Sequence, residues 1–237
     1  MENALRDAQA TNELREQFIA ILGHDLRNPL QAVSAAGEFL ELKSIDPALK
    51  VIAARIRTSV KRMSLLIDDV LDFARGRLGG GLGVKLDAID DLDAGLGAVV
   101  KEFQDGQPDR QILAHIHIAR RVRCDLGRIQ QVASNLIGNA LTHGAHSSPV
   151  KVNVRTENHD LVLEVWNAGD PIPADSIGKI FQPFWRRSTA SNREGLGLGL
   201  HICSQIVQAH GGSLSVASTR EDGTRFTARL PLEASLQ

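Results

Sequence analysis

Aromatic residues are scarce in this chain, which has no tyrosine and only 4% aromatic residues among its 237. Because 43% of the residues are hydrophobic, the core must be aliphatic, and it suffices for one large domain or two small ones. An excess of charge of one sign is also lacking, since the formal net charge is -1. This balance gives no indication of a general surface for nucleic acid or membranes.

Cysteine and long apolar runs are equally rare. Cys124 and Cys203 lie far apart and form no CxxC pattern, so we expect buried or free thiols in a reducing compartment. No apolar run reaches the roughly 18 residues that a membrane span requires, and the charged N-terminus does not resemble a signal peptide. We therefore expect a cytoplasmic chain without a membrane span, which can still be part of a longer protein.

The first third of the sequence predicts a helical hairpin. Residues 2–42 follow a helical period that Ser44-Ile45-Asp46-Pro47 interrupts, and Asp46 can cap a second helix that starts at Pro47. The apolar stripes of the two helices comprise Ile19, Leu22, Leu26, Val33 and Leu40, and Ile52, Ile56, Val60, Met63, Ile67, Val70 and Ala74. A single hairpin has no closed core, so we expect a homodimer in which two antiparallel hairpins form a four-helix bundle.

A glycine-rich segment follows the hairpin and predicts a domain boundary. Four of the seven residues in 77–83 are glycine, which makes the backbone flexible. We therefore expect three parts, namely a helical hairpin over 1–76, a linker over 77–83 and a second domain over 84–237.

The second domain is expected to be an α/β sandwich with helices on one face of a sheet. Asp125 can cap a helix that ends at His143-Gly144, and another helix runs from about Leu198 to His210, before two glycines. Alternation of apolar and polar residues predicts strands at 112–118, 150–156, 161–167, 213–218 and 225–230.

Four places in the sequence are candidates for chemistry, and the first surrounds His24. This histidine points away from the apolar stripe, Asp25 is its neighbour, and Asn28 lies one helical turn later on the same face. A neutral imidazole is nucleophilic, and a nearby carboxylate can orient it and accept its proton. Pro29 removes a hydrogen bond and should loosen the helix here. An exposed surface histidine without a role explains the same pattern.

The other three places lie in the second domain. Asn135 and Asn139 share the polar face of their helix, where amide oxygens suit Mg²⁺, although a solvated face is the alternative. The segment 167–173 follows an apolar strand and forms either the edge of a nucleotide pocket or an ordinary turn. The glycine-rich segment 195–200 precedes a helix N-terminus, which favours phosphate, but it is neither a P-loop nor a dinucleotide-binding motif.

Together these places resemble one family, the sensor histidine kinases of two-component systems. Residues 18–30 resemble its H box and residues 131–140 its N box, while 180–184 and 195–200 resemble the F box and the second glycine box. The resemblance extends from about residue 10 to 232. The H box and the Asn-x-Gly-x-Pro form of the first glycine box, at 167–171, look like those of bacterial phytochromes.

The resemblance implies a function and a set of site residues. The hairpin would be the dimerisation and phosphotransfer domain, and the second domain an ATP-binding domain of the gyrase, chaperone and kinase type with a mixed sheet. The γ-phosphoryl group of ATP would move to His24, with Asp25 as base, and then to an aspartate of a response regulator, on which Asn28 would assist dephosphorylation. An upstream sensor domain would control the reaction. Asn139 would bind Mg²⁺, and the nucleotide would contact Asn135, Asn139, His143, Asn167, Gly169, Phe184, Gly195, Gly197 and Gly199.

Two residues depart from the family pattern. Asn167 stands where the family has an aspartate that accepts a hydrogen bond from the adenine amine, and Thr142 stands where it has a basic residue. Both changes predict weaker ATP binding, unless Arg186, Arg187 or Arg193 supplies a cation. Two other classes of protein remain open. One is an ATPase or anti-sigma-type kinase that shares only the nucleotide domain, and the other is a degenerate kinase that acts as a phosphatase or scaffold.

Overall fold

The computed structural model describes residues 2–44, 46–77, 82–186 and 196–233, with only the backbone described for residues 2–18, 20 and 77. The chain divides after Gly81 into two compact units. Most of the glycine-rich segment 77–83 lies outside the described residues. None of the helices in the described ranges has both the length and the apolar character that crossing a membrane requires.

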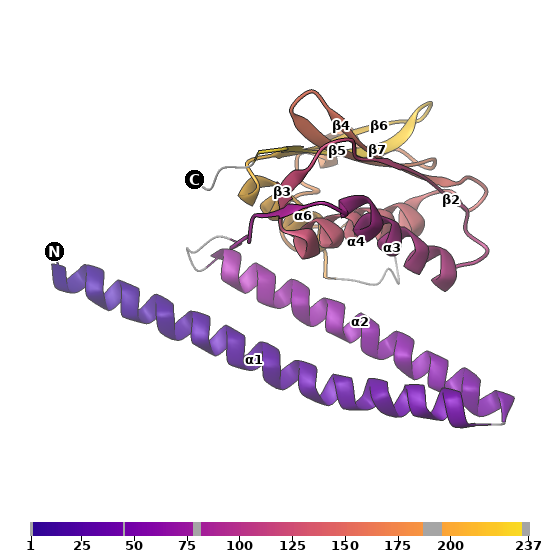
Figure 1. Cartoon of the computed structure of the whole chain (residues 1–237), viewed down its shortest axis with the longest axis horizontal. Coiled ribbons are helices and arrows are strands. Elements are labelled where there is room, and N and C mark those ends of the chain that lie inside the picture. Colours follow the sequence, from indigo (N-terminus) through magenta and orange to yellow (C-terminus); the bar gives the residue numbers. More distant parts are fainter. Residues whose placement is uncertain (1, 45, 78–81, 187–195, 234–237) are drawn as a thin grey trace. The chain divides into compact units, whose positions relative to one another are not determined.

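The first unit is the predicted helical hairpin (Figure 1). Helix α1 (Glu2–Lys43) and helix α2 (Pro47–Arg77) lie side by side. The backbone N–H of Ala48 donates to Asp46 Oδ1 at 2.8 Å, so Asp46 caps α2 as predicted. Helix α1 continues through Pro29, at the cost of one backbone hydrogen bond.

Small residues bring the two helices of the hairpin together. Gly23, Gly37 and Ala53 are all buried, and a β-carbon placed on Gly23 would lie 2.7 Å from Leu71 Cδ1. Most of the apolar stripe predicted for α1 lies elsewhere: Ile19 is buried, but Leu22, Leu26, Val33 and Leu40 are 38–45% exposed. The apolar stripe of α1 and its face against α2 are therefore largely different surfaces.

The second unit contains a five-stranded mixed sheet with the strand order β2-β4-β5-β7-β6. Strand β2 pairs with β4 in parallel, and the other neighbours are antiparallel. The strands are β2 (Ile112–His117), β4 (Val150–Glu157), β5 (Asp160–Asn167), β6 (Ser213–Thr219) and β7 (Gly223–Pro231). All five strands were predicted, with boundaries shifted by up to two residues.

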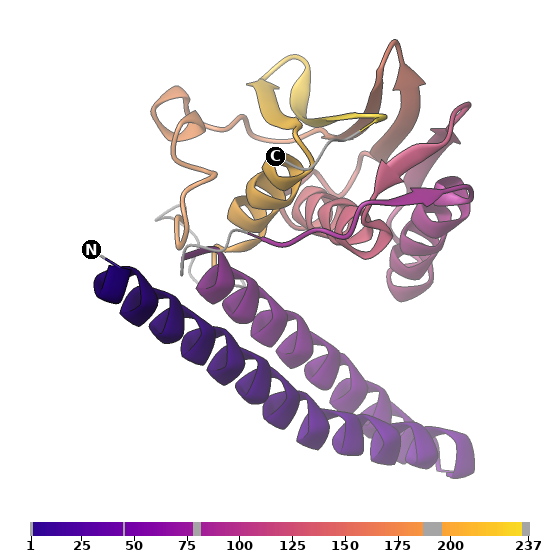
Figure 2. The ribbon, with the colours of Figure 1, turned by 60° about the vertical axis from the view of Figure 1, so that its left-hand side comes forward.

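Three helices cover one face of this sheet (Figures 1 and 2). They are α3 (Leu92–Gly106), α4 (Leu126–His143) and α6 (Gly199–Ala209). Alternation along the strands directs Val152, Leu163 and Phe226 into the core with these helices, and all three are at most 3% exposed. The predicted helical hairpin followed by an α/β sandwich is thus confirmed.

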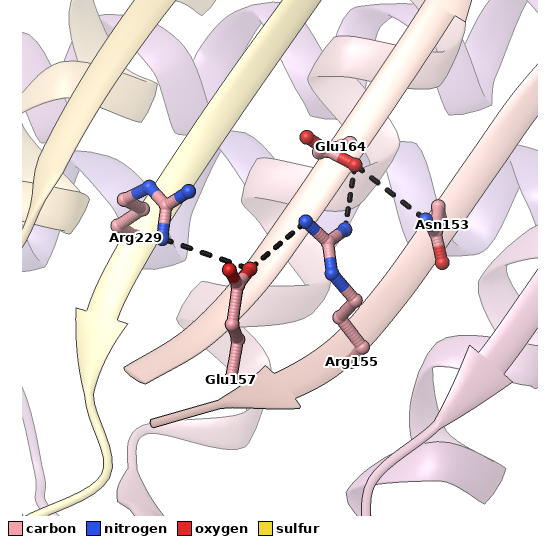
Figure 3. A network of polar contacts seen from close by, with 5 residues as sticks. All are labelled: Asn153, Arg155, Glu157, Glu164 and Arg229. Carbon is pink, nitrogen blue, oxygen red and sulfur yellow. Dashed lines mark hydrogen bonds and ion pairs between the residues drawn. The ribbon is translucent and has the colours of Figure 1, made fainter. Parts of the chain in front are cut away.

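The opposite face of the sheet is polar and carries a network of charges (Figure 3). Arg155 donates to Glu164 at 2.6 Å and to Glu157 at 3.0 Å, and Arg229 lies 3.9 Å from Glu157. The hydrogen bond with Glu164 is the main reason that the pKa of Arg155 is raised. Because the charges of opposite sign neutralise one another across three strands, this face can remain in water.

Several short elements and one long helix were not predicted. They are α3, the small antiparallel pair β1 (Asp87–Ile89) and β3 (Val122–Cys124), and the single turn α5 (Ala174–Ile177). The prediction of a half-buried strand at 112–118 also needs correction. Ile112 is buried, but Ala114 is exposed because β2 lies at the edge of the sheet.

Both cysteines are buried and neither forms a disulfide, which agrees with the prediction of buried or free thiols. Burial, and then the charge of Asp125, raises the pKa of Cys124 to about 11. This thiol is therefore protonated and unreactive in the folded protein.

Candidate functional site

His24 stands on the exposed face of α1 with two polar neighbours. Its side chain is 73% exposed, and its Nδ1 lies 3.2 Å from Asp25 Oδ1. The amide nitrogen of Asn28, one turn along, lies 3.2 Å from Nδ1 and 3.4 Å from Nε2 of the same ring. The structure therefore brings together the three residues that the sequence singled out on this helix.

The two contacts to Nδ1 require different tautomers of the imidazole. Donation from Nδ1–H to Asp25 leaves the lone pair on Nε2, where it can attack an electrophile. Donation from the Asn28 amide to Nδ1 requires the lone pair on Nδ1 and the proton on Nε2. The contact of Asn28 to Nε2 at 3.4 Å fits the tautomer that Asp25 favours, in which Nε2 carries the lone pair and is nucleophilic, whereas its contact to Nδ1 fits the other tautomer.

The second candidate site is a polar row on α4 in the other unit. The side chain of Asp125 accepts from the backbone N–H of Arg128 at 3.1 Å, so this cap fixes the start of the helix. Its apolar side is buried under the sheet, which leaves Asn135, Asn139 and His143 on the outer side. These residues are four apart, so the row spans roughly 12 Å along the helix axis.

At one end of the row, Asn135 meets the start of α6. Its amide nitrogen lies 3.4 Å from the carbonyl oxygen of Gly199, and a β-carbon on Gly199 would lie 3.4 Å from Asn135 Cγ. The backbone N–H groups of the first turn of α6 have no partners within the helix and suit phosphate oxygens. Glycine at this position keeps them close to Asn135.

The glycine-rich segment is tied to residues 184–185. The backbone N–H of Phe184 donates to the Gly197 carbonyl at 3.0 Å. Gly197 has a φ of +71°, and a β-carbon there would lie 2.7 Å from the carbonyl oxygen of Trp185. Phe184 itself has a φ of +62° and is 56% exposed. The predicted site residue Gly195 lies outside the described residues, as do Arg187 and Arg193.

At the other end of the row, the loop after α4 meets the loop after β5. The backbone N–H of Ala145 donates to the Ala168 carbonyl at 2.7 Å. Asn167 is only 6% exposed and donates from its amide to the same carbonyl at 3.1 Å. A β-carbon on Gly169, whose φ is +143°, would lie 3.2 Å from the carbonyl oxygen of His143. Asn167 and Gly169 therefore lie beside the C-terminal end of α4.

Asn139 occupies the middle of the row and is a suitable magnesium ligand. It is half-buried, and its side chain makes no hydrogen bond to the rest of the described chain, so its amide oxygen is available. Within the described ranges, no three side chains of His, Cys, Asp or Glu gather as a metal site. A donor set of one amide oxygen, substrate phosphates and water fits Mg²⁺ better than a transition metal. The hydroxyl group of Thr142 donates to the Gly138 carbonyl of its own helix at 2.8 Å.

The sequence did not indicate that His201 contacts the segment that carries Phe184. Its Nδ1 lies 3.0 Å from the carbonyl oxygen of Phe181, which links α6 to the segment that carries Phe184. Phe181 packs edge-on against Phe226 of β7, with 6.4 Å between the ring centroids. A histidine two residues after Gly199 was the only signal, and it does not specify a partner in a distant loop.

Two family models match the chain, one in each unit. The model "His Kinase A (phospho-acceptor) domain" matches residues 14–79. The model "Histidine kinase-, DNA gyrase B-, and HSP90-like ATPase" matches residues 124–234. His24 lies in the first match, and the polar row of α4 lies in the second.

Similar proteins and structures point the same way. A bacteriophytochrome of Pseudomonas aeruginosa is 35% identical over 98% of this chain, which covers 32% of that protein. The catalytic domain of the histidine kinase ThkA is 30% identical, with a TM-score of 0.51 over 60% of this chain and 94% of that one. Full-length ShkA in complex with AMPPNP has the same fold, with a TM-score of 0.68 at 23% identity over 93% of this chain and 47% of that one. The chain spans less than half the length of curated relatives such as the bacteriophytochrome.

Proposed function

Because the chain belongs to the sensor histidine kinases of two-component systems, we propose that it phosphorylates its own His24 with ATP. The phosphoryl group then passes to an aspartate in the receiver domain of a response regulator. The observation that carries the proposal is the exposed His24 with Asp25 and Asn28 within hydrogen-bonding distance. His24 is 73% exposed and contributes nothing to the core, so packing does not explain its presence.

The chemistry at His24 follows from the tautomer that Asp25 favours. The lone pair of Nε2 attacks the γ-phosphorus, an N–P bond forms, and the bond from phosphorus to the bridging oxygen breaks to release ADP. The ring becomes positively charged, and Asp25 stabilises that charge and can accept the proton from Nδ1 at 3.2 Å. Asn28 cannot take up a proton, so its amide is suited to positioning a water molecule on the phosphorylated regulator.

The nucleotide is proposed to lie along the polar row of α4. Asn167 and Gly169 contact the adenine end beside His143, while Asn135 and the glycines at 197 and 199 contact the phosphates. Phe184 borders the same loop through its hydrogen bond to Gly197. When Mg²⁺ is bound, it offsets the charge of the phosphates, and Asn139 is its proposed protein ligand.

Both departures from the family pattern persist in the three-dimensional arrangement. The side-chain amide of Asn167 donates to the Ala168 carbonyl, so its oxygen can still accept from the adenine amine. This hydrogen bond would be weaker than one to a charged acceptor. Thr142 bonds to its own helix and supplies no cation. We therefore propose weaker ATP binding than an aspartate and a basic residue would give.

A homodimer is proposed from the apolar surface of the hairpin. Leu22, Leu26, Val33 and Leu40 on α1 are 38–45% exposed, and Ile52, Met63 and Val70 on α2 are 44–51% exposed. Two hairpins that pack through these residues would bury them in a four-helix bundle.

The proposed division of the chain follows the sequence prediction. Residues 1–76 dimerise and carry His24, residues 77–83 form the linker, and residues 84–237 bind ATP. We place the chain in the cytoplasm, under the control of a sensor domain outside it.

Incubation with γ-labelled ATP and Mg²⁺, followed by acid and alkali treatment, tests the proposal. Phosphohistidine is labile in acid and stable in alkali, so the label should follow that pattern. Asp25→Asn should slow labelling by about 10² to 10⁴. Asn28→Ala should leave labelling largely intact and slow dephosphorylation of the regulator. A chain that hydrolyses ATP without labelling itself would support the ATPase class, and one that only dephosphorylates a regulator would support the degenerate class.

A further inference from the structure

We propose that the ion pair between Arg27 and Asp68 positions His24 for reaction by fixing the rotation of α1 against α2. This inference rests on the proposed role of His24 as the phosphoacceptor. Arg27 Nε lies 3.0 Å from Asp68 Oδ1, and Arg27 Nη2 lies 2.5 Å from the same oxygen. The two residues are 41 positions apart in the chain and link the two helices of the hairpin.

The ion pair lies on the face of α1 that meets α2. Gly23 and Arg27 are one helical turn apart on α1, and their partners Leu71 and Asp68 are three residues apart on α2. Gly23 lets the helices approach closely, but it has no side chain that resists rotation. Arg27 is therefore the residue of this turn whose contact with α2 has a defined direction.

His24 lies next to this face, not on it. It follows Gly23 by one residue, and Asn28 follows Arg27 by one residue, so both lie about 100° around the helix from the contact with α2. A rotation of α1 would therefore carry the imidazole, Asp25 and Asn28 to a new direction as a group. Phosphoryl transfer depends mainly on alignment, and small displacements of a reacting group cost large factors in rate.

Stability is not a sufficient reason for this ion pair. The side chains of Arg27 and Asp68 are 41% and 39% exposed, and exposed ion pairs contribute little to stability. Two N–H groups of one planar guanidinium that converge on a single carboxylate oxygen do, however, restrict the direction of the contact. The geometry therefore suits a positioning role better than a stabilising one.

The hairpin offers a closely matched control. Arg57 Nη1 lies 2.5 Å from Glu41 Oε2, the side chains are 49% and 35% exposed, and this pair also links α1 to α2. It likewise adjoins a glycine contact, because a β-carbon on Gly37 would lie 3.1 Å from Arg57 Cγ. The pair lies near the turn of the hairpin, far along α1 from His24. Loss of the Arg27–Asp68 pair and loss of the Arg57–Glu41 pair should therefore have similar effects on the stability of the hairpin. Only loss of the Arg27–Asp68 pair should slow phosphorylation of His24.

The test uses the full chain and five proteins, namely the wild type, Arg27→Gln, Asp68→Asn, the double variant and Arg57→Gln. Circular dichroism confirms that each is helical, and labelling at varied ATP gives kcat and KM separately. We expect Arg27→Gln and Asp68→Asn each to lower kcat by about tenfold to a hundredfold, with KM for ATP unchanged. The double variant should be no slower than either single variant, because both remove the same contact. Arg57→Gln should stay within about twofold of the wild type, as for a pair remote from the reacting groups.

A second measurement does not depend on phosphorylation. The Cε1–H signal of His24 in heteronuclear NMR, assigned by its loss in His24→Gln, should shift in both single variants and not in Arg57→Gln. If the wild type does not label, the proposed function fails, and this signal alone then decides the positioning role. Normal kcat in Asp68→Asn would show that Arg27 acts directly on the phosphate, which overturns the inference. Equal losses in Arg57→Gln, multiplied losses in the double variant, or an unshifted His24 signal would overturn it as well.

Discussion

Replacement of Gly197 by alanine is a direct test of the glycine-rich segment beside α6. The φ of +71° is costly for an L residue, by about 1–2 kcal/mol. The new β-carbon would also lie 2.7 Å from the Trp185 carbonyl oxygen and 3.1 Å from the Phe184 carbonyl carbon. Both are backbone atoms, so the contact cannot be relieved by a side-chain rotation. The segment must move, and it loses the hydrogen bond from Phe184 N–H to the Gly197 carbonyl.

The cost should appear as weaker nucleotide binding. If nucleotide binding requires the present backbone conformation at Gly197, a conformational cost of about 1–2 kcal/mol corresponds to an increase in Kd of about five- to thirtyfold. Calorimetry with an ATP analogue and Mg²⁺ measures this. Gly97→Ala is the matched control, because Gly97 lies within α3 and an added β-carbon meets nothing within 4 Å. It should raise the unfolding midpoint, since alanine favours a helix by up to ~1 kcal/mol over glycine, and leave Kd unchanged. Unchanged affinity in Gly197→Ala would show that the nucleotide does not use this loop.

Three further predictions concern single side chains. Asn139→Ala should abolish the Mg²⁺-dependent part of nucleotide binding and leave the unfolding midpoint nearly unchanged; unaltered calorimetry would remove Asn139 from the site. Asn167→Asp should keep or improve ATP affinity, by up to about 1 kcal/mol. It should lower the unfolding midpoint without nucleotide, because the hydrogen bond to the Ala168 carbonyl is lost. A large loss of affinity would mean that the Asn167 amide donates to the base. Burial, and then the charge of Asp72, raises the pKa of Asp69 from 3.8 to about 6, so its ionisation opposes folding and hairpin stability falls as the pH rises through that range. Asp69→Asn should therefore stabilise the chain by on the order of 1–2 kcal/mol at pH 7.5 and not at pH 4, and equal effects in urea titrations at both pH values would contradict this.

Much of the fold could be predicted because its signals are local. Asp46 and Asp125 each cap a helix as their positions suggested, and alternation found all five strands of the main sheet. Helix α3 was missed although Leu92, Leu96, Val99 and Val100 follow a helical spacing and are all buried. Two glycines interrupt its pattern, and Asp91 makes no side-chain hydrogen bond as a cap, so the local preference was weak.

Candidate site residues could be proposed from the sequence, but most contacts between them could not. The hydrogen bond between Phe184 and Gly197 depends on two residues with positive φ, one of which is a phenylalanine that seldom adopts it. The pairing of Arg27 with Asp68 depends on the register of the hairpin, which the turn near Asp46 sets. The cluster of Asp25 and Asn28 around His24 was the exception, because it lies within one helical turn.

Phosphorylation of His24 is the central claim, and labelling of His24→Gln with γ-labelled ATP tests it most directly. His24 is 73% exposed and lies off the contact between α1 and α2, so its replacement should preserve the fold, the proposed dimer and the proposed ATP binding. The wild type should acquire an acid-labile, alkali-stable label, and His24→Gln should acquire none. A label of the same kind and amount on His24→Gln would show that His24 is not the phosphoacceptor.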